Sequence, residues 1–151
     1  MPQALRFRKI LLGVAAGLLG AIGGLILAYL VGVVVIFIRT SELFPTLLVA
    51  LTYLPLMLLF VLLGPSIVIT STVGLMLGIA NFTKHAAGLF AVGAITGLML
   101  GEIVLSLVLP LIVVPQSGDF TSIISNHYLS GAYGLILGGL TSLFFRWLAA
   151  D

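Results

Sequence analysis

Cysteine is absent from the 151 residues of this chain. Its absence excludes disulfides, thiolate metal sites, iron–sulfur clusters and cysteine nucleophiles, and it leaves the redox compartment undetermined. The sequence also lacks a phosphate-binding loop, a dinucleotide fingerprint and a metalloprotease helix. We therefore predict no catalytic residues, no metal site, no cofactor and no enzymatic activity.

Charge is almost as scarce as cysteine. Only 7% of the residues are charged and 62% are hydrophobic, whereas a soluble domain is about a quarter charged. So little polar material cannot coat a water-soluble surface, but a surface that faces lipid needs almost none. The composition predicts an all-α integral membrane protein, a polytopic helical bundle whose solvent is the lipid bilayer.

The few cations gather at the start of the chain. Arg6, Arg8 and Lys9 make up half of the six Lys and Arg residues. They flank the first apolar run, which is typical of a signal for membrane orientation, so we do not expect nucleic-acid binding. The run itself, residues 10–38, has no charge over 29 residues. A secretory signal has an apolar core of only about 7 to 15 residues, so we expect this segment to be retained.

Four apolar stretches predict a single transmembrane domain over residues 1–151. About 20 helical residues cross a hydrocarbon core of roughly 30 Å. The second stretch would be about 60 Å long as one straight helix, so we predict a break at 64–65, where Gly64 precedes Pro65. The predicted spans are about 10–38, 43–83, 86–113 and 128–147, with a loop at 114–127.

The number of crossings depends on the second stretch. If it crosses once overall, five of the six cations lie on the inner side, as the bias for positive cytoplasmic segments requires. If its two halves each cross, the total is five and the cations divide three against three. Residues 20–28 and 93–101 form a faint repeat, and each copy follows basic residues. If both copies have the same orientation, the number of membrane crossings between them is even. We predict four crossings, with five as the alternative.

Small residues recur at every fourth position and form stripes along the predicted helices. Such stripes let another helix backbone approach closely. They face either the chain's own helices or a partner, which is another membrane subunit or a second copy. The helix-packing glycines that we predict are Gly20, Gly24, Gly32, Gly74, Gly78, Gly93, Gly97, Gly101, Gly134 and Gly138.

Glu102 lies inside the third apolar stretch, where an ionisable side chain is costly and is a candidate functional residue. We expect it to be buried, either as a proton- or cation-coupling residue or in a structural hydrogen bond, such as one to Ser106. Residues 93–102 resemble the carboxylate-bearing helix of rotary ATPase proteolipid subunits. In the four-helix members of that family the working Glu lies on the final helix, however, and here it lies on the third. We do not assign the chain to that family.

His85 and His127 flank the third span and are expected near opposite membrane faces, which argues against a shared metal. Whether either ligates a pigment or haem stays open.

The sequence thus leaves two hypotheses for function. The first is a small non-enzymatic membrane subunit or scaffold that packs against partner membrane helices through its Gly/Ala stripes. The second is an ion- or proton-coupled transporter or channel component that uses Glu102. We expect a multi-pass protein of the bacterial cytoplasmic (inner) membrane with its amino terminus inside.

Overall fold

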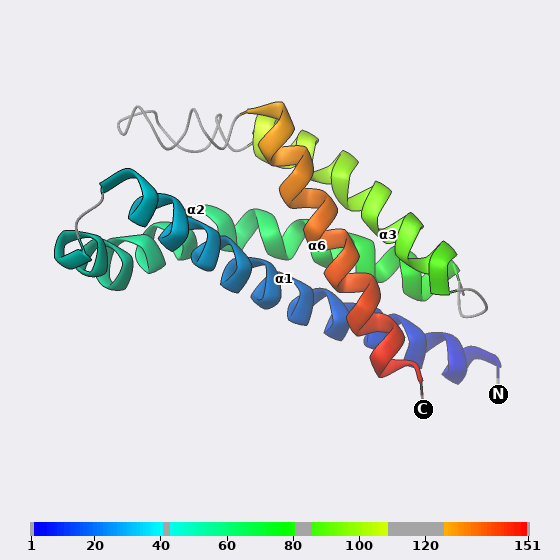
Figure 1. Cartoon of the computed structure of the whole chain (residues 1–151). Coiled ribbons are helices and arrows are strands. Elements are labelled where there is room, and N and C mark those ends of the chain that lie inside the picture. Colours follow the sequence, from blue (N-terminus) through cyan, green and yellow to red (C-terminus); the bar gives the residue numbers. More distant parts are fainter. Residues whose placement is uncertain (1, 41–42, 81–85, 109–125, 151) are drawn as a thin grey trace.

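The structure is a computed structural model, and it describes residues 2–40, 43–80, 86–108 and 126–150. Every regular element in these ranges is helical (Figure 1). The predicted loop at 114–127 and the end of the third predicted span lie almost wholly outside them. The elements are α1 (Pro2–Thr40), α2 (Leu43–Ala80), α3 (Ala86–Gly101), the π-helix η1 (Glu102–Val108) and α6 (His127–Leu148).

Four of the described helical segments are long and apolar enough to cross a membrane. They are Gln3–Ile38, Ala50–Ala80, Ala86–Val108 and His127–Leu148, and the third combines α3 with η1. This confirms the predicted all-helical architecture with four apolar segments. The last helix begins and ends within one residue of the predicted span, whereas α1 begins eight residues before the predicted 10–38.

The helices pack as two antiparallel pairs. Helix α1 packs mainly against α2, and α3 packs mainly against α6. Figure 1 shows α6 crossing α1, and it shows both chain termini at the same end of the molecule. Helices α1 and α2 have 39 and 38 residues, whereas α6 has 22. The first pair is therefore about 57 Å long and extends well beyond the second, which is about 33 Å long.

Helix α2 is continuous through Gly64 and Pro65, where the sequence predicts a break, and it also contains Pro55. Each proline lacks the N–H that would bond the carbonyl one turn earlier. Apolar packing holds the helix together on both sides of Pro65, because Leu62 and Ile69 belong to one buried cluster. Prolines are tolerated in this way inside membrane helices when neighbouring helices support them. The predicted interruption at 64–65 is therefore wrong.

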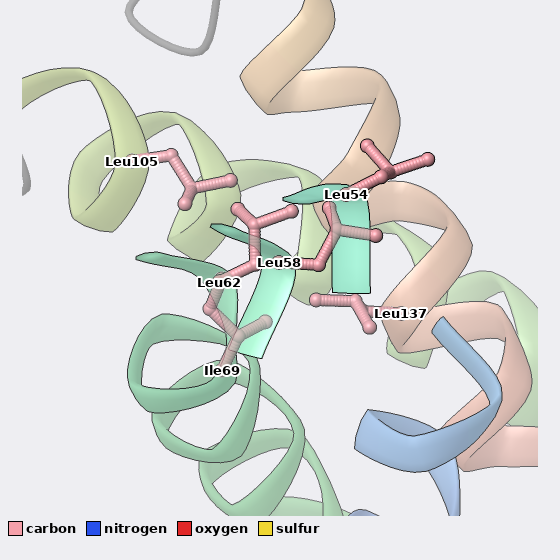
Figure 2. Packing of buried hydrophobic residues seen from close by; sticks show 6 residues of the cluster. All are labelled: Leu54, Leu58, Leu62, Ile69, Leu105 and Leu137. Carbon is pink, nitrogen blue, oxygen red and sulfur yellow. The ribbon is translucent and has the colours of Figure 1, made fainter. Parts of the chain in front are cut away.

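Two buried clusters hold the pairs together. One lies where α2, η1 and α6 meet, and Figure 2 shows its side chains pointing toward one another: Leu54, Leu58, Leu62, Ile69, Leu105 and Leu137. The second joins all four helices nearer the chain termini: Ala16, Val73, Leu77, Leu89 and Phe145. Because Leu12 and Leu148 pack on this second cluster, the start of α1 and the end of α6 lie together.

Buried hydroxyl groups in the described helices are all hydrogen-bonded. Thr70 donates to the carbonyl of Ser66, and Thr141 donates to that of Leu137, at 2.8 Å in both cases. Each bond returns to the same helix one turn earlier. These hydroxyls therefore add no unsatisfied polar group to an apolar interior.

Candidate functional site

The glycine stripe of α1 meets the end of α2. A Cβ atom placed on Gly74 would overlap the carbonyl oxygen of Gly13. One placed on Gly78 would lie 2.8 Å from the carbonyl oxygen of Lys9. At both points the two backbones touch, so no larger residue fits without moving a helix.

The second glycine contact joins α3 to α6. A Cβ atom on Gly97 would overlap the carbonyl oxygen of Gly134, and one on Gly101 would lie 2.6 Å from the Cα of Gly134. Gly93 faces Ser142 and the carbonyl of Gly138 in the same way. Here glycines stand on both sides of the contact, which brings the two backbones together over about two helical turns.

The remaining predicted glycines also face helices of the same chain. A Cβ atom on Gly20 would meet Thr141, and one on Gly24 would meet Leu137, so both lie where α1 crosses α6. A Cβ on Gly32 would lie 2.9 Å from the side chain of Leu54 on α2. All ten predicted glycines therefore face the chain's own helices, which leaves other surfaces for any partner.

Glu102 is the first residue of η1 and directly follows Gly101. Gly101 faces α6, and successive residues of a helix differ by about 100° in direction, so Glu102 lies at the side of the α3–α6 contact and not within it. Its side chain is 51% exposed. The described helices therefore do not enclose Glu102, and its expected burial within an apolar span stays a prediction.

The carboxylate of Glu102 pairs with a histidine. Its Oε1 lies 3.4 Å from Nδ1 of His127, the first residue of α6, and the His127 side chain is 67% exposed. This pair is ionic when His127 is protonated. The predicted bond from Glu102 to Ser106 is not formed by the carboxylate, because the Ser106 hydroxyl donates to the backbone carbonyl of Glu102 instead.

The start of α6 adds polar groups beside this pair. Asn126 caps the helix, since its Oδ1 accepts a hydrogen bond of 3.0 Å from the N–H of Tyr128. The amino terminus of a helix carries a partial positive charge, which favours an anion such as the Glu102 carboxylate. The neighbouring η1 is a π-helix, a conformation that is frequent at functional sites.

This arrangement can hold and exchange a proton, because an exposed carboxylate and an imidazole lie within reach of each other. It does not supply a metal site on its own. No group of three or more His, Asp or Glu side chains comes together among the described residues. His85 lies outside the described residues, so the predicted separation of the two histidines is not described.

Comparisons with protein-family models, with curated proteins and with solved structures find no match to this chain.

The sequence predicts separate roles for Glu102 and His127. Their positions before and after one connection between antiparallel helices could have predicted that the two side chains lie close together. That signal is obscured in the sequence, because the apolar residues continue from 103 to 114 without a charge. Such a run predicts a helix whose end lies far from Glu102.

Proposed function

We propose that the chain is a non-enzymatic multi-pass membrane subunit or scaffold that acts by packing against a partner membrane helix. The observation that carries this proposal is the length of α2, which extends over 38 residues without a charged side chain. At 1.5 Å per residue it is about 57 Å long, and a tilt of about 40°, the upper end of the usual range, still leaves it spanning about 44 Å. A hydrocarbon core covers only about 30 Å of that length.

Three large exposed side chains lie on the first half of α2. Tyr53, Leu56 and Phe60 are 64%, 54% and 86% exposed. They follow one another at spacings of three and four residues, so they share one face of the helix. Large exposed aromatic side chains are typical anchors of protein contacts. We assign the partner helix to this face, which we call the α2 face (Tyr53, Leu56 and Phe60).

The α2 face differs from the partner surface that the sequence predicts, which is the Gly/Ala stripes. The Gly/Ala stripes close contacts within the chain, so a partner would have to displace α2 or α6 to use them. The α2 face needs no such displacement. A second copy of the chain is an alternative occupant, and the mass of the purified particle distinguishes the two.

The proposed orientation places the amino terminus inside, in a bacterial cytoplasmic membrane, with four crossings. The packing of Leu12 and Leu148 on one buried cluster supports an even number of crossings, because it puts the two ends of the chain at one end of the bundle. Arg6, Arg8 and Arg146 then share one side, as the bias for positive cytoplasmic segments requires.

The test is purification in mild detergent from the native membrane, with the mass of the particle determined for the wild type and for the variant Tyr53→Ala/Phe60→Ala. We expect a partner at fixed stoichiometry in the wild type and its loss from the variant. The matched control is Ile22→Ala/Ile26→Ala on the exposed side of α1, which should keep the partner. Recovery of the wild type as a monomer with nothing bound would contradict the proposal.

A second candidate function is proton- or cation-coupled transport, and the observation that favours it is the pairing of Glu102 with His127 beside a π-helix. The test is ion or proton flux in liposomes that contain the purified chain. Glu102→Gln should abolish the flux, because the amide cannot exchange a proton. Flux that is the same in the variant and the wild type would exclude this candidate.

A further inference from the structure

A hollow lies on the outside of the α3–α6 pair, at the end where α3 begins and α6 finishes. Its volume is about 280 Å³, close to the lower limit of about 300 Å³ for typical ligand pockets. Phe90 and Leu143 are 45% and 53% exposed, so the hollow opens outward. It is lined by Ala86, Ala87, Leu89, Phe90, Ser142, Leu143 and Arg146.

One wall of the hollow is fixed by packing. The ring of Phe90 lies against Gly139, where an added Cβ would come within 3.2 Å of the ring. The small side chains of Ala86 and Ala87 leave the space open. The Ser142 hydroxyl donates to the carbonyl oxygens of Gly138 and Leu89 at 3.0 and 3.2 Å. With that hydroxyl engaged, the floor of the hollow is essentially apolar.

Arg146 is the charged group of the hollow. Its side chain is exposed, and it makes no ion pair with any side chain in the described ranges. Trp147 follows it and is 70% exposed, as expected for an aromatic anchor at headgroup level. The first N–H groups of α3, at Ala86 and Ala87, have no partner within their helix and add positive potential at this end.

We propose that this hollow binds an anionic phospholipid, with the headgroup phosphate at Arg146 and an acyl chain against Leu89, Phe90 and Leu143. A guanidinium at one end of an apolar surface matches the division of a phospholipid into a phosphate and a hydrocarbon chain. This inference rests on the proposed membrane insertion, but it is independent of the partner helix on the α2 face. An experiment that disproves one of these two proposals therefore does not disprove the other.

The first experiment measures lipid binding to the full chain by native mass spectrometry. The probes are phosphatidylglycerol and phosphatidylcholine with identical acyl chains. We expect tighter binding of phosphatidylglycerol, and Arg146→Gln should weaken it about fivefold, the effect of one cation facing anionic lipid. The control Arg8→Gln removes a cation from the start of α1 and should change the binding less than about twofold. Equal binding of the two lipids, or equal losses in the two variants, would overturn the proposal.

The second experiment fills the hollow and keeps its charge. Ala87→Leu places a larger side chain in the hollow and should reduce phosphatidylglycerol binding, whereas Ala91→Leu, on an exposed position one turn later and outside the lining, should not. Circular dichroism and gel filtration confirm that both variants fold as the wild type does. Unchanged binding in Ala87→Leu would show that lipid does not occupy the hollow.

Discussion

The hydroxyl oxygen of Tyr133 on α6 lies 3.0 Å from the hydroxyl oxygen of Ser66 on α2. Ser66 is completely buried and directly follows Pro65. This hydrogen bond joins the two helix pairs beside the position where proline removes a backbone bond from α2. It therefore contributes to the support of a continuous α2.

Breaking this bond should destabilise the fold modestly. Hydrogen bonds between membrane helices contribute about 0.6 kcal/mol on average and about 1.7 kcal/mol at most. We expect Ser66→Ala and Tyr133→Phe each to lower the free energy of unfolding by an amount in that range, with little further loss in the double variant. Unfolding by SDS in mixed micelles measures the change. The control Tyr128→Phe, at a side chain that is 88% exposed, should have no effect, and full additivity of the two substitutions would contradict the bond.

Replacing a glycine at the α3–α6 contact with a larger residue should lower the free energy of unfolding. Gly97→Ala places a methyl group against the carbonyl of Gly134, and such overpacking typically costs about 1 to 3 kcal/mol. Gly64→Ala is the matched control, since an added Cβ there meets nothing within 4 Å. Because alanine favours a helix over glycine by up to about 1 kcal/mol, Gly64→Ala should leave stability unchanged or raise it. Unfolding in SDS compares the two, and equal effects would refute the close contact.

The absence of cysteine makes the crossing number directly measurable. Single cysteines at Gln3, Asn126 and Ala150 can be labelled with a membrane-impermeant maleimide in intact cells and in inverted vesicles. Four crossings predict that Gln3→Cys and Ala150→Cys are labelled only in inverted vesicles and Asn126→Cys only in intact cells. Labelling of positions 3 and 150 from opposite sides would establish an odd number instead.

The Glu102–His127 pair should contribute little to stability. Its side chains are 51% and 67% exposed, and exposed ion pairs contribute at most about 1 kcal/mol before screening by salt. Glu102→Gln should therefore lower the free energy of unfolding by less than that, and added salt should reduce the difference. A larger loss would show that the carboxylate has a structural role and would remove the argument for its part in transport.

The helices could be predicted from the sequence because their signal is local. Apolar runs with few charged residues locate all four segments, and Tyr128 and Trp147 bracket the last one closely. The continuity of α2 could not be predicted, because it depends on the packing of Leu62 and Ile69 on either side of Pro65. Local rules place a break at a proline, but they do not include the neighbouring helices that support it.

The site was harder to predict than the helices. The stripes identified glycines that pack, yet their spacing does not say whether the facing backbone belongs to the same chain. Gly97 and Gly134 meet only because α3 and α6 fold back in one particular register. The pairing of Glu102 with His127 depends on the same register, and for that reason no sequence motif predicts it.

Gly20 and Gly24 let α1 approach α6 closely where the two helices cross. A crossing of this kind acts like a pivot, because rotation about it moves the distant ends of the pairs much more than it disturbs the close contact. The contacts within each pair extend over several turns and resist such a movement. We therefore expect any relative movement of the two pairs to be a rotation about this crossing rather than a sliding of helices within a pair.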